Sequence, residues 1–203
     1  PTYRESIGAN DTDTGGGVRV ALVDTGVDSS ADGLGYVEHH NVSDAPDGDG
    51  FGHGTFLAGI IAGDGTHRGV APGANLLDVQ VADAKGNTSL SKVLRGLLAI
   101  QDLNANGDDD DDVDVVNLSL STDSPLPPAF DPLSRALVAL WESGVTVVVA
   151  AGNDGPGWGT VSSPGNTPTL LTVGALDEGA SSDADDDTVA DFSARGSLSD
   201  VDK

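Results

Sequence analysis

Residues 18–28, Val-Arg-Val-Ala-Leu-Val-Asp-Thr-Gly-Val-Asp, run from an apolar segment directly into a polar turn that begins at Asp24. Further segments of this kind follow along the chain. They are apolar almost without interruption, which is typical of strands that are covered on both faces. The predicted strands are residues 18–23, 74–81, 113–120, 145–150 and 170–173.

Two segments between these strands have the spacing of amphipathic helices. From Leu90 to Leu98, leucine and valine recur on one stripe. The other segment begins at Asp131-Pro132, where a capping residue precedes a first-turn proline, places Trp141 on its core side and ends at Gly144. Strands that alternate with helices predict an α/β fold of three layers, with a mainly parallel central sheet between the helices. A length of 203 residues suits one domain, residues 1–203.

The composition is strongly acidic, with 33 acidic against 9 basic residues and a net charge of −24. This charge argues against extended contact with nucleic acid phosphates or an anionic membrane. It is typical of proteins from salt-loving organisms, and an acidic secreted protein that binds calcium is the alternative. No apolar run approaches the roughly 20 residues of a membrane helix. We therefore expect neither nucleic acid nor membrane as a partner.

Polar residues stand where strands or helices would present them. Asp24 ends the first predicted strand, His53 opens a glycine-rich helical segment, and Asn153 follows the fourth strand. Parallel sheets bind ligands at the carboxyl ends of their strands. A carboxylate that orients an imidazole, an imidazole that acts as general base and an amide that donates to an oxyanion together make a hydrolase site. Asp24, His53 and Asn153 are therefore the predicted catalytic residues.

The helical segment that follows His53 combines small and large apolar residues. We expect Gly54, Ala58 and Gly59 to allow close contact with a neighbouring element. The larger side chains are expected to fill the core, and they are Leu57, Ile60 and Ile61. His39 and His40 are assigned to an ordinary loop, because no ligand pattern accompanies them.

Several short motifs occur in a characteristic order. The chain resembles the catalytic domain of the subtilisin-like serine peptidases and is most similar to the secreted halolysin-type members. The resemblance covers nearly the whole chain, and its specificity comes from the number of motifs in sequence. They are Ile7-Gly8-Ala9, residues 20–28, Gly52-His53-Gly54-Thr55, Gly69-Val70-Ala71-Pro72, residues 115–120, Ala150-Ala151-Gly152-Asn153, Ser163-Pro164-Gly165, Val173-Gly174-Ala175 and Phe192-Ser193.

This resemblance implies hydrolysis of peptide bonds through an acyl-enzyme intermediate, with Asp24 orienting His53 and Asn153 stabilising the oxyanion. It also implies a substrate strand bound along an edge formed by Ser119, Leu120 and Ser121, with Gly152 beside the oxyanion position. No cofactor is needed for such chemistry. Polypeptide substrates, a propeptide in the precursor and an extracellular location are the further expectations.

The nucleophile motif of the family, Gly-Thr-Ser-Met-Ala, does not occur in the sequence, which contains no methionine. We expect that the 203 residues lack the C-terminal part of the domain that carries the serine, so that this fragment alone is inactive. The alternative is a non-catalytic protein that keeps the scaffold to bind peptides. An acidic module that buffers calcium is a third candidate.

One acidic segment partly matches a calcium-binding loop. Its oxygen-bearing residues fall at alternate loop positions, and Gly107 permits the sharp turn, but the twelfth position is Val113 where a bidentate Glu is expected. The incomplete match favours a solvated acidic insertion, and a structural calcium site is the alternative. The predicted ligands are Asp102, Asn104, Asn106, Asp108 and Asp110.

Overall fold

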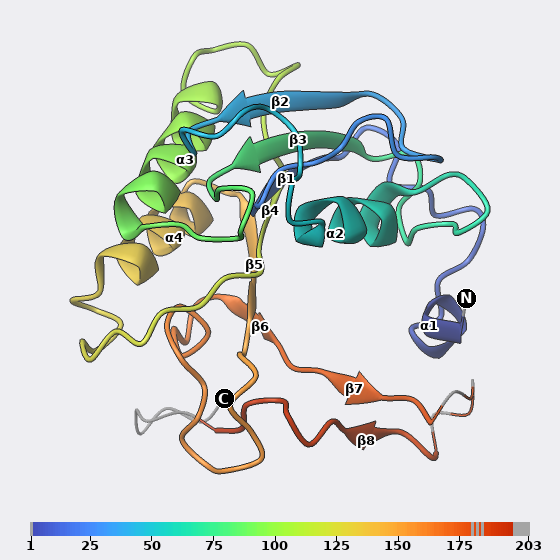
Figure 1. Ribbon diagram of the computed structural model, residues 1–203, viewed down its shortest axis with the longest axis vertical. Helices are drawn as coiled ribbons and strands as arrows, with labels where there is room; N and C mark the ends of the chain where they lie inside the picture. Colours follow the sequence, from blue (N-terminus) through green and yellow to red (C-terminus); the bar gives the residue numbers. More distant parts are fainter. Residues whose placement is uncertain (1, 180, 182, 184, 197–203) are drawn as a thin grey trace. The chain divides into compact units, whose positions relative to one another are not determined.

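The computed structural model describes residues 2–179, 181, 183 and 185–196, which form two compact units (Figure 1). Unit 1 comprises residues 9–117, and unit 2 comprises residues 2–8 together with residues from 118 onward. The helices are α1 (Thr2–Ser6), α2 (His53–Ala62), α3 (Leu90–Leu103) and α4 (Pro132–Glu142). The strands are β1 (Arg19–Asp24), β2 (Val37–Asn41), β3 (Asn75–Gln80), β4 (Val115–Leu118), β5 (Thr146–Ala150), β6 (Leu171–Val173), β7 (Leu176–Asp177) and β8 (Thr188–Val189).

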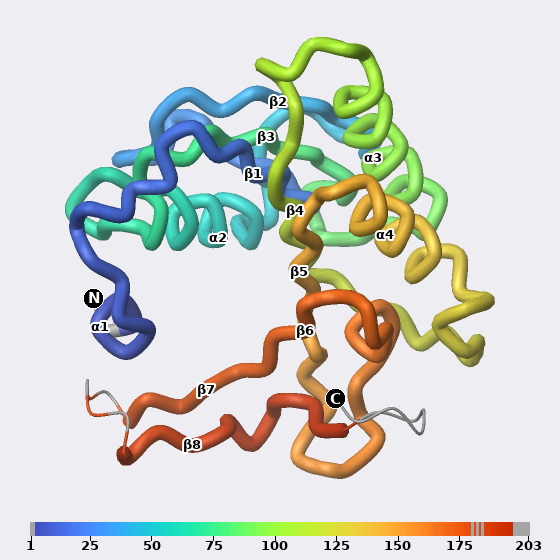
Figure 2. The backbone as a smooth tube through the Cα atoms, turned by 180° about the vertical axis from the view of Figure 1, so that it is seen from behind, coloured from blue at the N-terminus to red at the C-terminus, as the bar shows by residue number. Residues whose placement is uncertain are grey.

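The sheet of unit 1 has the strand order β2-β3-β1-β4. β1 pairs in parallel with β3, and β3 pairs in parallel with β2 (Figures 1 and 2). All six residues of β1 are buried, which confirms the prediction from its almost continuous apolar run. The predicted strands at 74–81, 113–120, 145–150 and 170–173 correspond to β3, β4, β5 and β6.

Helices α2 and α3 cover opposite faces of this sheet. Val20 and Leu22 of β1 belong to the same buried cluster as Ala58 of α2. On the other face, a Cβ atom added to Gly96 of α3 would lie 2.8 Å from Val79 of β3. Alternate residues of a strand point to opposite faces, so the two helices must lie on different sides. Unit 1 therefore has the predicted three layers, helix, parallel sheet and helix.

Helix α2 packs on the sheet through its smallest residues. Its buried positions are Gly54, Ala58 and Ala62. Leu57 and Ile61 pack against the core cluster and remain partly exposed. The expectation for Gly59 is wrong, because a Cβ atom built there would meet nothing within 4 Å.

Unit 2 contains a parallel pair, β5 with β6, and an antiparallel pair, β7 with β8. Helix α4 packs against β5. Asp131 caps this helix as predicted, since its side chain accepts a hydrogen bond of 2.8 Å from the Ser134 amide. Gly144 follows the helix with φ of 106°, in the left-handed region expected of a terminating glycine. Trp141 is only half-buried, unlike the core position expected from its spacing.

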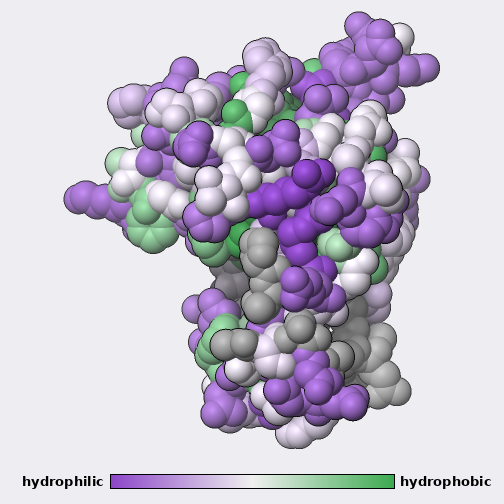
Figure 3. Space-filling view, turned by 90° about the vertical axis from the view of Figure 1, so that its right-hand side faces the viewer, coloured by the Kyte–Doolittle hydropathy of each residue, from purple (hydrophilic) through white to green (hydrophobic). Residues whose placement is uncertain are grey.

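The surface agrees with the acidic composition. The face of the molecule in Figure 3 is mostly hydrophilic, as expected for a chain with a net charge of −24. Within the described residues, we find no helix with the length and apolarity that a membrane crossing requires.

Candidate active site

Asp24 and His53 form a short hydrogen-bonded pair in unit 1. Asp24 is the last residue of β1 and is 0 % exposed, and His53 is the first residue of α2. The distance from His53 Nδ1 to Asp24 Oδ1 is 2.7 Å. An ionised carboxylate can only accept, so Nδ1 carries the proton in this contact and Nε2 is left as the basic nitrogen. The His53 side chain is 39 % exposed, which makes a proton transfer from a bound partner feasible.

The close approach of the two segments depends on glycine. A Cβ atom on Gly54 would lie 2.1 Å from the carbonyl oxygen of Gly26 and 3.3 Å from Cβ of Asp24. No real side chain tolerates the first of these contacts. Gly54 therefore lets the start of α2, and with it the imidazole of His53, reach the end of β1.

Unit 1 contains a second contact between an aspartate and a histidine, which the sequence did not predict. Asp78 on β3 is 1 % exposed, and its Oδ2 accepts hydrogen bonds from Val27 N at 3.0 Å and from His39 Nδ1 at 2.9 Å. Burial raises the pKa of Asp78 to about 6, although the bonds from His39 and Val27 act in the opposite direction. His39 and His40 lie on strand β2, so their assignment to a loop is wrong.

Unit 2 carries the other predicted site residues. Asn153 follows β5 and is exposed, and Gly152 before it has φ of 104°. The backbone of this segment is fixed by a bond from Ala194 N to Gly152 O at 3.0 Å.

The residues predicted to bind substrate come directly after β4 and belong to unit 2. Ser119 and Leu120 are half-buried and Ser121 is exposed, and they lie outside any regular element just before the bridge between Thr122 and Ser163. The roles of Asn153, Gly152 and these three residues stay predictions.

The predicted calcium ligands lie in the last turn of α3 and in the segment that follows it. Asp102 lies in the last turn of α3, and the Asn104 side chain bonds both N and O of Val113 at 2.9 Å. Asn106 and Asp108 accept hydrogen bonds from nearby backbone amides. Across the described part of the chain, no three His, Cys, Asp or Glu residues are close enough to hold a metal. The side-chain oxygens of Asn104, Asn106 and Asp108 thus accept hydrogen bonds from the backbone of the same segment, and calcium binding stays a prediction.

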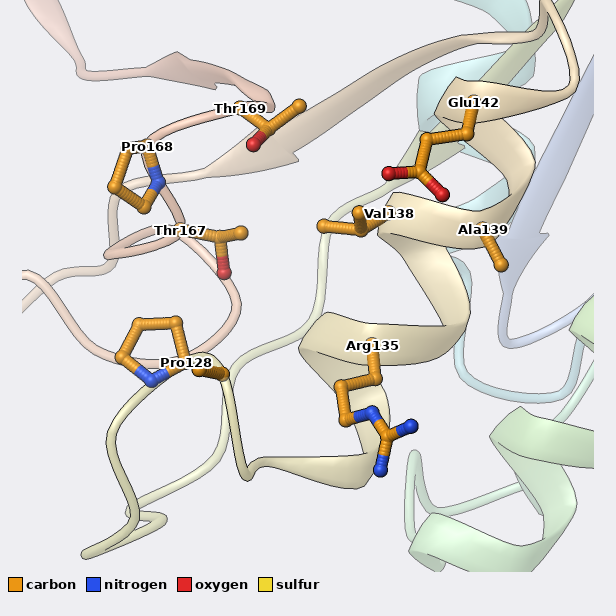
Figure 4. Close-up of a pocket in the computed structure, with 9 residues that line it drawn as sticks. Pro128, Arg135, Val138, Ala139, Glu142, Thr167, Pro168 and Thr169 are labelled. Carbon is orange, nitrogen blue, oxygen red and sulfur yellow. The ribbon is translucent and has the colours of Figure 1, made fainter.

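Unit 2 also contains a pocket of about 470 Å³ beside α4 (Figure 4). Arg135, Val138 and Glu142 line it from the helix, and Thr167 to Thr169 line it from the facing loop. Its walls include none of the predicted site residues.

Comparison with known proteins identifies the family. The model of the subtilase family matches residues 15–202, and the chain belongs to that family. Serine protease AprX of Bacillus subtilis (strain 168) is 38% identical over 203 residues, which cover 95% of this chain and 46% of AprX. Subtilisin-like protease 2 of Pseudogymnoascus destructans is 40% identical over 202 residues, with coverage of 94% and 44%. The chain thus spans about half the length of these curated relatives.

A solved structure supports the same fold. Sphericase superimposes with a TM-score of 0.74 at 29% sequence identity, over 91% of this chain and 61% of its own. The predicted α/β architecture with a mainly parallel central sheet is confirmed.

Proposed function

We propose that this chain forms part of a serine endopeptidase that cleaves polypeptides through an acyl-enzyme intermediate. The observation that carries the proposal is the 2.7 Å contact between His53 Nδ1 and Asp24 Oδ1 at the carboxyl end of β1. Membership of the subtilase family and the similarity to proteins named serine proteases support it.

In this reaction Asp24 holds the imidazole with Nδ1 protonated and stabilises the imidazolium that forms. His53 Nε2 takes the proton from a serine hydroxyl as the serine oxygen bonds to the substrate carbonyl carbon. Asn153 donates a hydrogen bond to the resulting oxyanion. The C–N bond then breaks, His53 returns the proton to the leaving amine, and water hydrolyses the acyl-enzyme by the same steps.

The serine that His53 would activate is proposed to lie outside these 203 residues. Their sequence contains no Gly-Thr-Ser motif, and the chain matches 46% of AprX. On this proposal, residues 1–203 alone are inactive.

The proposed substrate is an extended peptide that forms main-chain hydrogen bonds along Ser119, Leu120 and Ser121, with Gly152 beside the scissile carbonyl. Such bonds do not depend on side-chain identity, so the cleavage is broad. An extracellular enzyme made with a propeptide, of the halolysin type, is consistent with the acidic composition and with similarity to a relative named minor extracellular protease Vpr.

The experiment is labelling with a fluorophosphonate probe, which reacts with activated serines. The protein from the complete reading frame should be labelled and should cleave peptides, whereas residues 1–203 should not be labelled. His53→Ala should lower kcat of the complete protein by more than about 10⁴-fold. Labelling of residues 1–203 would contradict the placement of the serine. A complete reading frame without an activated serine would support the alternative, a peptide-binding scaffold.

A further inference from the structure

Asp49 joins the two segments that carry Asp24 and His53. Its Oδ1 accepts a hydrogen bond of 2.9 Å from the Thr25 hydroxyl, and its Oδ2 accepts one of 2.8 Å from the Thr55 hydroxyl. Thr25 is the residue after Asp24 on one segment, and Thr55 lies in the first turn of α2 on the other. The Asp49 carboxylate therefore accepts a hydrogen bond from one hydroxyl of each segment.

Each hydroxyl oxygen in turn accepts a hydrogen bond from a backbone amide of the opposite segment. The Gly54 amide of α2 donates to Thr25 Oγ1 at 2.9 Å, and the Asp28 amide of the other segment donates to Thr55 Oγ1 at 2.9 Å. A hydroxyl has one proton, and when it donates that proton to Asp49 its lone pairs face the incoming amide. Asp49 thus orients both cross-links, and we call Thr25, Asp49 and Thr55 the clasp.

Asp49 also stabilises the start of α2 directly. The amides of Gly52 and Thr55 donate to it at 2.7 and 2.9 Å. Gly52, the N-cap residue, has no side chain to do this. A negative charge at a helix N-terminus is favourable, because the helix dipole is positive there. Burial would raise the pKa of Asp49, but the bonds from the Thr55 and Gly52 amides and the two hydroxyls outweigh it and lower the pKa.

We propose that Asp49 is a positioning residue, which through the clasp holds the imidazole of His53 in register with Asp24. This inference rests on the proposed function, since it concerns the same pair. Among the described residues, charged groups that interact with Asp49 include Asp28 and Asp78, the last paired with His39, and Asp24 is the residue before Thr25.

The test uses Asp49→Asn in the protein from the complete reading frame. Both carboxylate oxygens accept at least one N–H, so the amide nitrogen of Asn would face a donor at either position. We expect kcat to fall about 50-fold with KM within about twofold, because a small misplacement of the base slows proton transfer. The acid limb of the pH profile of kcat/KM should move to lower pH, since one negative charge near His53 is lost.

Matched variants separate positioning from folding. Thr25→Val removes one cross-link and should lower kcat about tenfold, while Thr25→Ser keeps the hydroxyl and should restore it. Asp131→Asn removes a carboxylate that caps α4 and should leave the acid limb in place. If Asp49→Asn fails to fold, the Thr25 pair still decides the question. The proposal is overturned if Asp49→Asn or Thr25→Val keeps kcat within threefold of the unchanged protein.

The two proposals fail differently. Activity that survives in Asp24→Asn and His53→Ala overturns the serine peptidase itself. Activity that is lost in those variants but kept in Asp49→Asn overturns only the role of Asp49.

Discussion

Helices α2 and α4 both begin beside a carboxylate, yet the two carboxylates reach their helices in different ways. Asp131 is itself the N-cap of α4 and bonds Ser134 three residues later. At α2 the N-cap is Gly52 with φ of 97°, and the carboxylate comes from Asp49 in the preceding turn. The first arrangement is a local capping motif. The second also connects the helix start to the segment that carries Asp24, through the bond from the Thr25 hydroxyl to Asp49.

The two carboxylates therefore connect their helices to different parts of the molecule. Asp131 accepts a hydrogen bond from the hydroxyl of Ser163, and both residues are buried in unit 2. Asp49 accepts a hydrogen bond from the hydroxyl of Thr25, the residue that follows the buried Asp24. Substitutions at the start of α4 should therefore change stability, and substitutions at the start of α2 should also change the geometry of the Asp24–His53 contact.

The largest effect on stability is expected at Gly54. Gly54→Ala forces a Cβ atom against the Gly26 carbonyl oxygen and should destabilise the protein by about 3 kcal/mol, a typical cost of overpacking. Gly59→Ala on the same helix is the control, because open space surrounds it, and it should be neutral or stabilising by up to about 1 kcal/mol. Chemical denaturation of both variants in a His53→Ala background, which prevents self-digestion, measures the difference. Equal stabilities would show that the close approach does not constrain α2.

The contributions of Asp78 and Asp131 to the free energy of unfolding should depend on pH with opposite sign. Asp78 accepts a hydrogen bond from the Val27 amide in the turn after Asp24, and Asp131 is the N-cap of α4. The folded protein keeps a proton on Asp78 up to about pH 6, whereas the unfolded chain releases it near 3.8. The free energy of unfolding should therefore fall as pH rises through this window, by about 2 to 3 kcal/mol in the contribution of Asp78. The measurement is the stability difference between the unchanged protein and Asp78→Asn at several pH values from 4 to 7. A difference that stays constant over this range would contradict the assignment.

Asp131 should show the opposite sign. Burial would raise its pKa, but bonds from the Ser134 amide and from serine hydroxyls lower it overall, so its contribution is present above the ordinary value and lost in strong acid. Asp131→Ala should cost about 2 kcal/mol at neutral pH, as the cap and a buried acceptor are removed. Thermal unfolding measured at pH 7 and pH 3 tests this, and a cost that grows at pH 3 would refute it.

Sequence reasoning succeeded where the signal is local. The almost continuous apolar run that ends at Asp24 and the capping sequence Asp131-Pro132 each carry their structural meaning within a few residues. It missed β2 because Glu38, His39 and His40 give that strand little apolar character. Asp49 escaped notice for another reason, since its partner Thr25 lies 24 positions away and only folding brings the two together.

The complete burial of Asp24 has a consequence for the conditions under which the protein works. Dissolved salt screens the attraction between solvent-exposed charges, and at 1 M the screening length is about 3 Å. Salt ions cannot enter between Asp24 and His53, whose contacting atoms are 2.7 Å apart with the carboxylate shielded from solvent. Brine and dilute buffer should therefore change how strongly the acidic exterior repels itself while leaving the alignment of this pair the same.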